Sequence, residues 1–286
     1  VLGTVQDAGS PHIGCDRACC ALLHERPDPD RMVVSLGVVD RRAGRSYLFE
    51  ATPDLPAQLR RLRVDEPDAA PALADDIPDG VFLTHAHIGH YTGLMYFGKE
   101  AMGADRVPVY AMPQMARFLR SNGPWSQLVS EENIALRELE ADRAEALTPD
   151  FSVVPFRVPH RDEFSETVGY RLQGPRRTAL FIPDIDKWER WDRDIVEEIR
   201  KVDIAFLDAT FHSDHELPGR DMSQIPHPFV VESMARFAEL PAAERAKIVF
   251  IHLNHTNPLL DPGSEETAEV ECAGFRVAQT GDVFRL

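Results

Sequence analysis

Short apolar runs separated by polar turns dominate the 286-residue chain, and amphipathic stretches with helical spacing lie between them. The apolar runs predict strands at residues 1–9, 80–84, 107–112, 133–140, 151–160, 167–174, 178–186, 202–210 and 247–258. Hairpins are expected over 31–54, with the turn at 42–44, and over 271–286. Helices are expected over 55–63, 91–103, 113–122, 188–202 and 227–240, and a surface loop over 65–80. Neither repeats nor a linker interrupt the pattern, which indicates one domain over 1–286.

Composition narrows the class of protein. Hydrophobic residues make up 43% of the chain, and no apolar run reaches the roughly 20 residues that span a bilayer. The net charge of −16 argues against nucleic acid as the main partner, because phosphate contacts need clustered Lys and Arg. We therefore expect neither a membrane nor a nucleic-acid partner. A small-molecule substrate is expected, and a homodimer is left open.

The four cysteines are too few for a disulfide-dense protein, which favours a reducing compartment, the cytoplasm. A leader removed ahead of Val1 would not be visible in this sequence. Cys272 stands alone near the end of the chain and is expected to be a small core residue.

Several histidines directly follow apolar runs that predict strands. They are His85, His87 and His90 in "THAHIGHYTGL", His160, and His252. Neutral imidazole is the most common protein ligand of zinc-type metals, and strand ends hold ligands rigidly. A carboxylate is expected from Asp184, directly after "FIP", in preference to Asp186 or Asp208. The sequence therefore predicts a metal centre at the ends of several strands.

The histidine motif resembles the His-x-His-x-Asp-His signature of the metallo-β-lactamase fold superfamily. The stretches "VLGTVQDAGSPHIGCDRACC", "HRDEFSETVGY", "FIPDID" and "HLNHTNP" are most similar to the pyrroloquinoline quinone biosynthesis protein B-like members. More distantly, they resemble the cyclic-phosphate phosphodiesterases of phosphonate metabolism. The resemblance covers nearly the whole chain. It implies an α/β (α+β) fold, a four-layer αββα sandwich with the site at one edge of its two sheets.

The resemblance also implies a ligand set for two metals. The first metal would be bound by His85, His87 and His160, the second by His90 and His252, with Asp184 between them. In the superfamily the second metal also takes the aspartate of the signature. Here Gly89 stands in that position, and glycine has no side chain to offer.

Three metal arrangements remain open with Gly89 in the signature. In the first, zinc fills only the three-histidine site. In the second, metals fill both sites, and solvent takes the place of the missing carboxylate. In the third arrangement His90, His252 and Asp184 form the two-histidine, one-carboxylate set typical of non-haem Fe²⁺ oxygenases. A Gly89→Asp variant would test whether the missing carboxylate limits phosphodiesterase or lactamase activity.

The leading hypothesis is a metal-dependent hydrolase with one or two catalytic Zn²⁺, in which metal-bound hydroxide attacks an ester, phosphodiester or amide. Asp184 and His227 are the candidate catalytic groups. His227 lies at a predicted helix start within the polar segment 211–229, which is expected to cover the site. His212 and His215 are expected to be solvated. The alternatives are an iron-dependent oxidase or hydroxylase in cofactor or peptide-derived natural product biosynthesis, and a non-catalytic metal- or ligand-binding protein.

The remaining cysteines cluster in "GCDRACC", a spacing that suits metal ligation better than bridging. Cys15, Cys20 and His255, with Cys19 as the fourth ligand and His12 as the alternative, are expected to hold a structural Zn²⁺. The related phosphodiesterases imply a three-cysteine, one-histidine zinc, although their spacing is Cys-x-Cys-x-x-Cys and not Cys-x-x-x-Cys-Cys. Such a site would tie the N-terminal loop to the strand before His255.

Overall fold

The computed structural model describes residues 1–64 and 77–286, so most of the expected loop 65–80 lies outside the described residues. The described chain forms a five-stranded sheet, order β1-β2-β3-β4-β5, and a seven-stranded sheet, order β12-β11-β10-β9-β8-β7-β6. The first sheet consists of β1 (Leu36–Asp40), β2 (Arg45–Phe49), β3 (Gly80–Phe82), β4 (Val107–Ala111) and β5 (Ile134–Glu138). The second consists of β6 (Glu145–Thr148), β7 (Phe151–Arg157), β8 (Val168–Gln173), β9 (Thr178–Ile182), β10 (Ile204–Asp208), β11 (Ile248–Ile251) and β12 (Arg276–Val277).

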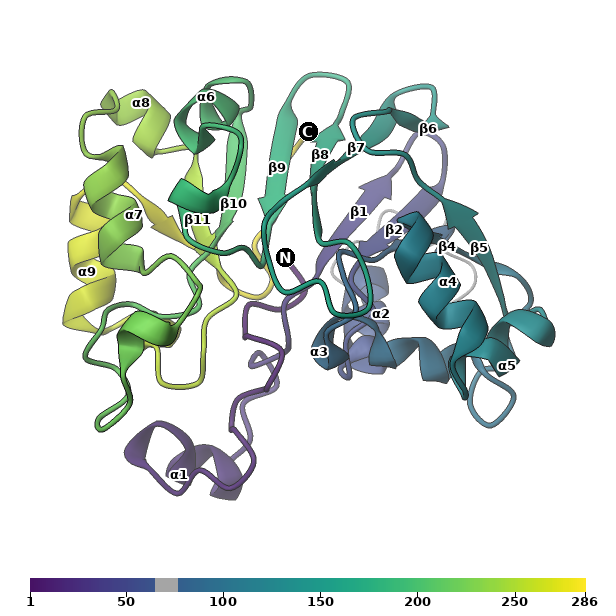
Figure 1. Cartoon of the computed structure of the whole chain (residues 1–286), viewed down its shortest axis with the longest axis horizontal. Helices are drawn as coiled ribbons and strands as arrows, with labels where there is room; N and C mark the ends of the chain where they lie inside the picture. Colours follow the sequence, from purple (N-terminus) through teal and green to yellow (C-terminus); the bar gives the residue numbers. More distant parts are fainter. Residues whose placement is uncertain (65–76) are drawn as a thin grey trace.

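Helices lie on the outer side of each sheet, and α1 (Ala18–Glu25) lies apart on the N-terminal segment (Figure 1). The five-stranded sheet carries α2 (Leu55–Val64), α3 (Ile88–Tyr91), α4 (Pro113–Ser121) and α5 (Trp125–Ser130). The seven-stranded sheet carries α6 (Ile195–Arg200), α7 (Val230–Phe237), α8 (Ala242–Arg245) and α9 (Glu265–Cys272). Short 3-10 helices are η2 (Thr92–Phe97), η3 (Trp188–Arg190), η4 (Met222–Gln224) and η5 (Pro258–Leu260).

Three apolar layers fill the spaces between these elements. In β9, Leu180 and Ile182 pack toward the helices, whereas Phe181 packs between the two sheets. The same alternation places Leu207 of β10 toward the helices and Phe206 between the sheets. Because both faces of these strands are buried, their sequence is a continuous apolar run. The predicted four-layer αββα sandwich is confirmed.

The strands that precede the candidate ligands point toward one edge of the sandwich. Strands β9, β10 and β11 are parallel to one another, and β7 shares their direction because β8 is antiparallel to both β7 and β9. In the other sheet, the chain after β3 meets this edge, where the Val168 N–H donates to the Thr84 carbonyl at 3.1 Å. Residues that follow these strands are therefore brought to one place.

Several predicted elements differ from the structure. The hairpin over 31–54 and the helix over 55–63 are confirmed, but residues 1–9 form only isolated bridges to Ser35, Val33 and Leu253. The hairpin over 271–286 is wrong: α9 ends at Cys272, and β12 pairs in parallel with β11. Cys272 is exposed, so its predicted place in the core is also wrong. Among the described helices, none is both long and apolar enough to span a membrane.

Candidate metal centre

Four predicted ligands converge where β3, β7 and β9 end. His85, His87, His160 and Asp184 each offer one ligand atom, and these atoms lie within 4.8 Å of one another. The Asp184 carboxylate is central, with one oxygen 3.3 Å from His85 Nε2 and the other 3.2 Å from His160 Nε2. His87 turns its Nδ1 inward, 3.3 Å from His160 Nε2. We call these four residues the first half of the centre.

The ring nitrogens of this centre fit a bound metal. Nε2 of His85, of His90 and of His252 is buried and has no hydrogen-bond partner among the described residues. Buried polar atoms normally have a partner, because leaving one unpaired costs about 1–3 kcal/mol. Burial holds the pKa of His85 well below its usual range, and the positive charge of nearby His90 lowers it further. His85 is therefore neutral, which is the form that ligates metals.

The second half of the centre consists of His90, His252 and a residue that the sequence reasoning missed, Asp7. The ligand atoms of these three also lie within 4.8 Å of one another. His90 Nε2 lies 3.8 Å from the Asp184 carboxylate, which joins the two halves. The one signal for Asp7 in the sequence is its place two residues after the apolar run at the N-terminus, and that position alone does not mark it as a ligand.

In the structure, position 89 has no room for a side chain. A Cβ built on Gly89 would lie 2.1 Å from the Cβ of Asp7 and 2.6 Å from its Cα. The space for a signature aspartate is therefore already filled. A Gly89→Asp variant would therefore not simply add a carboxylate, because the new side chain has no room while Asp7 stays in place.

Four of the five histidines have a partner at Nδ1, and the fifth, His87, has its outward Nε2 3.0 Å from Arg161 Nη2. The partners of Nδ1 are Thr84 for His85 at 2.8 Å, Glu50 for His90 at 3.2 Å, Asp186 for His160 at 3.1 Å, and Thr210 for His252 at 2.9 Å. Such partners fix the tautomer and the ring orientation of a metal ligand. Asp186, which the sequence offered as an alternative ligand to Asp184, therefore orients the ligand His160. Glu50 also acts on charge: burial disfavours the charged His90, but the Glu50 carboxylate outweighs burial and, with no metal bound, raises the pKa of His90 to about 9. A metal that binds His90 would therefore displace a proton from it.

Two residues of the centre have left-handed backbone geometry that side chains other than glycine rarely adopt. The φ angle is +81° at Glu50 and +68° at His252. Backbone strain of this kind costs on the order of 1–3 kcal/mol and concentrates at functional sites. Both strained residues belong to the second half: His252 is a candidate ligand, and Glu50 is the partner of His90.

His227 lies beside the centre, as the sequence suggested. Its Nδ1 is 2.8 Å from Asp208 Oδ2 and 3.2 Å from Asp184 Oδ1, and 14% of its side chain is exposed. Burial lowers the pKa of His227, but the carboxylates of Asp208 and Asp184 outweigh burial and raise it. By contrast, His215 of the same segment is exposed. Asp208, the second alternative to Asp184, thus supports His227.

The sequence matches the family model of the beta-lactamase superfamily domain over residues 45–253. The chain belongs to the beta-lactamase superfamily. Among curated members it is 26% identical to coenzyme PQQ synthesis protein B of Methylobacterium radiotolerans, over 98% of this chain and 97% of that protein. It is 26% identical to the protein of the same name from Gluconobacter oxydans, over 100% of this chain and 97% of that one.

Solved structures agree with this membership. Zinc-bound PqqB from Methylobacterium extorquens superposes with a TM-score of 0.79 at 22% identity, covering 100% of this chain and 98% of that one. A diphosphatase of the PhnP family superposes with a TM-score of 0.64 at 26% identity, covering 98% of this chain and 93% of that one. The fold of this superfamily member is therefore the metallo-β-lactamase fold.

A second group of ligand-type side chains lies at the N-terminal segment of this beta-lactamase superfamily protein. Cys15, Cys19, Cys20 and His255 bring their ligand atoms within 4.8 Å of one another. The Sγ atoms of Cys15 and Cys19 are 3.9 Å apart, as are those of Cys19 and Cys20. His12, the alternative ligand, instead stacks on His255 with ring centroids 4.4 Å apart. Burial raises the pKa of the Cys19 thiol to about 12, so a bound cation would be needed to hold it as a thiolate at neutral pH.

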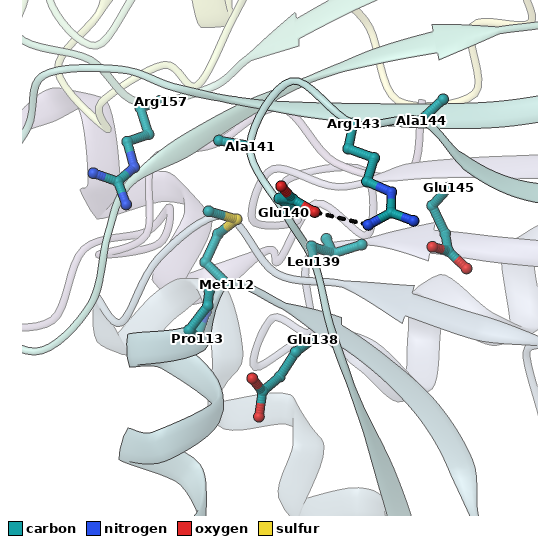
Figure 2. A pocket seen from close by; sticks show the side chains of 10 residues that line it. All are labelled: Met112, Pro113, Glu138, Leu139, Glu140, Ala141, Arg143, Ala144, Glu145 and Arg157. Atoms are coloured by element: carbon teal, nitrogen blue, oxygen red, sulfur yellow. Dashed lines mark hydrogen bonds and ion pairs between the residues drawn. The ribbon is translucent and has the colours of Figure 1, made fainter.

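A cavity of about 620 Å³ opens elsewhere on the molecule, beside the start of α4 (Figure 2). Its lining includes Met112, Glu138 and Arg157, and an ion pair between Arg143 and Glu140 at 2.8 Å crosses one side. None of the described residues that line it is a candidate metal ligand. The cavity is therefore separate from the metal centre.

Proposed function

We propose that the protein is a metal-dependent hydrolase that cleaves an ester, phosphodiester or amide with one or two Zn²⁺ in the centre. The observation that carries the proposal is the first half of the centre, where three imidazoles and one carboxylate face a common point. Three histidines with an open position for solvent are a competent set for catalytic zinc. The likeness to a PhnP-family diphosphatase supports a phosphate-containing substrate.

The residues of the centre would divide the work between binding and proton transfer. His85, His87, His160 and Asp184 would hold the first metal, which when bound lowers the pKa of a water and polarises the substrate oxygen. Arg161 lies at the rim, with Nη2 3.0 Å from His87 Nε2, and 61% of its side chain is exposed. An exposed guanidinium there suits an anionic substrate group such as a phosphate.

His227 would protonate the leaving group. Asp208, at 2.8 Å, holds the imidazole in place and favours its charged form, so a proton is available on this side of the centre. General acid catalysis of this kind contributes about 10²–10⁴-fold to a rate. Asp184 at 3.2 Å keeps the ring directed toward the ligand set.

The test is hydrolysis of nitrophenyl esters of phosphate, phosphodiester and carboxylic acid types by the zinc-loaded protein. On the corresponding phenyl or alkyl esters, whose leaving group needs a proton, His227→Ala should lower kcat by about 100-fold or more while zinc content stays constant. On the nitrophenyl esters, whose leaving group departs without a proton, the loss should be much smaller. His215→Ala is the matched control, because that exposed histidine belongs to the same segment. Zinc-loaded protein without activity on any of these classes would contradict the proposal.

An iron-dependent oxidase or hydroxylase is the second candidate. The second half of the centre offers two histidines and one carboxylate, the set typical of non-haem Fe²⁺ oxygenases. Relatives named coenzyme PQQ synthesis protein B support a role in cofactor synthesis. Oxygen consumption by the Fe²⁺-loaded protein with a tyrosine-containing peptide, absent with Zn²⁺, would favour this candidate over hydrolysis.

We also propose a structural Zn²⁺ at Cys15, Cys19, Cys20 and His255. Four soft or imidazole ligands in one cluster form the closed set that structural zinc takes. Because the cluster joins the N-terminal segment to the residues after β11, its metal would stabilise the fold and not take part in the reaction.

A further inference from the structure

We propose that Asp7 supplies the metal-binding carboxylate that the histidine signature lacks, so that Asp7, His90 and His252 bind a second metal. The proposal rests on the metal centre of the proposed hydrolase but not on the class of reaction. It assigns a ligand role to a residue outside the signature, and it explains why position 89 is a glycine.

The position of Asp7 matches the place where a signature aspartate would begin. A Cβ on Gly89 would fall 2.1 Å from the Cβ of Asp7, so both side chains would start from nearly the same point. The Asp7 carboxylate then lies with a ligand nitrogen of His90 and of His252 inside a 4.8 Å span. Two imidazoles and one carboxylate at that spacing can share one divalent ion, with the Asp184 carboxylate 3.8 Å from His90 Nε2 as a bridge to the first half.

The N-terminal segment holds Asp7 against the residues after β11. Val5 forms a parallel bridge with Leu253, the Gln6 N–H donates to the Leu253 carbonyl at 2.8 Å, and the Leu253 N–H donates to Thr4 at 2.8 Å. His252 directly precedes Leu253, so one hydrogen-bonded ladder positions both ligands. The Gln6 side-chain amide donates to Asp7 Oδ1, which leaves the other oxygen of the carboxylate for a metal.

Asp7 and Gly89 therefore depend on each other. Besides the Asp7 Cβ, a Cβ on residue 89 would meet the Asp7 carbonyl oxygen at 2.7 Å, so any larger residue must displace the N-terminal segment. The carboxylate can come from position 7 or from position 89, but the two side chains cannot coexist in this backbone arrangement. A methyl group at position 89 should thus have the same effect on the second metal as loss of the Asp7 carboxylate.

The experiment counts metals in the whole protein. Wild type, Asp7→Ala, Gly89→Ala and Asp16→Ala are dialysed against buffered Zn²⁺ and analysed by mass spectrometry. Asp16→Ala is the matched control, because Asp16 is exposed in the same segment. Circular dichroism checks folding, and Co²⁺ substitution reports the cysteine cluster separately through its thiolate absorption.

We expect the wild type and Asp16→Ala to bind two ions in the histidine centre, and Asp7→Ala and Gly89→Ala to bind one. The second ion should bind at least about 100-fold more weakly in both variants, since even an outer partner of a ligand is worth about 10–100-fold. Two ions bound to Asp7→Ala with wild-type affinity would overturn the proposal and leave the proposed hydrolase untouched. A wild type that binds only one ion in the histidine centre would also overturn it, whereas a wild type that binds none would remove the proposed function as well.

Discussion

The two halves of the metal centre differ in how their ligands are held. In the first half, His85, His160 and Asp184 follow strands β3, β7 and β9, which are inside the two sheets. In the second half, Asp7 comes from a segment outside the named strands, whose β-pairing consists of isolated bridges, and His252 has a left-handed backbone. The difference shows that a ligand missing from a sequence signature can be replaced from a distant segment, provided that the signature position is small enough to admit it.

The largest effect is expected from the residue that both halves share. Asp184→Ala should abolish metal binding in the first half and weaken it in the second, because the carboxylate contacts His85 and His160 and lies near His90. Activity should fall by about 10³-fold or more, as for the loss of a group on which the whole site depends. Asp186→Asn is the control, since it removes only an outer partner of His160 and should cost about 10–100-fold. Isothermal titration with Zn²⁺ measures the metal affinity of both variants. Equal losses of affinity in Asp184→Ala and Asp186→Asn would contradict a shared role for Asp184.

A smaller effect, confined to the second half, is expected from the cysteine cluster. The N-terminal segment carries Asp7 and Cys20, and the residues after β11 carry His252 and His255, so the cluster and the second half share both segments. Cys20→Ser should remove the structural zinc, lower the thermal midpoint, and weaken the second catalytic metal more than the first.

The control for that variant is Cys272→Ser, because Cys272 is exposed and distant in sequence from the cluster. Metal analysis of the two variants at matched free Zn²⁺ checks the expectation. If Cys20→Ser loses both catalytic metals equally, the two halves do not differ in their dependence on the N-terminal segment.

The smallest effect concerns how the free energy of unfolding depends on pH through Glu216, in the segment between β10 and α7. Glu216 accepts hydrogen bonds from the His212 N–H and from Thr256, next to His255, and burial raises its pKa to about 7. A carboxyl whose folded pKa is raised contributes stability at low pH that is lost as the pH rises from about 4.5 through about 7. Between pH 5 and 8, Glu216→Gln should therefore gain on the order of 2 kcal/mol relative to wild type, since one pKa unit corresponds to about 1.4 kcal/mol.

Urea unfolding of both proteins at the two pH values, with zinc present throughout, measures that change. Asp214→Asn serves as the control, because Asp214 is an exposed carboxyl of the same segment. A difference between wild type and Glu216→Gln that stays constant from pH 5 to 8 would show that Glu216 is not buried as described.

Most of the fold and the first half of the centre could be predicted from the sequence because they follow from short-range rules. Apolar runs such as the one before Asp184 predict strands, and parallel strands bring the residues after them to one edge. The hairpin around 42–44 has a local turn signal, and it is confirmed. These features depend on neighbours in the chain, which a single sequence displays.

Asp7 and the C-terminus could not be predicted because they depend on contacts between distant segments. Asp7, which excludes a side chain at Gly89, lies about 80 residues earlier in the chain, ahead of β1. No local pattern in the sequence links the two positions. Similarly, the stretch 265–272 has no strong apolar face, but it forms helix α9, which Ser264 caps by accepting from the Thr267 N–H. Tertiary packing decides such elements, and propensity alone is a weak guide to them.

Anomalous diffraction at the zinc absorption edge, from crystals of the wild-type protein grown with Zn²⁺, tests the central claim most directly. The account predicts one peak among the ligand atoms of His85, His87, His160 and Asp184, and a second beside Asp7, His90 and His252. A map without density between the first four side chains would contradict the metal centre itself.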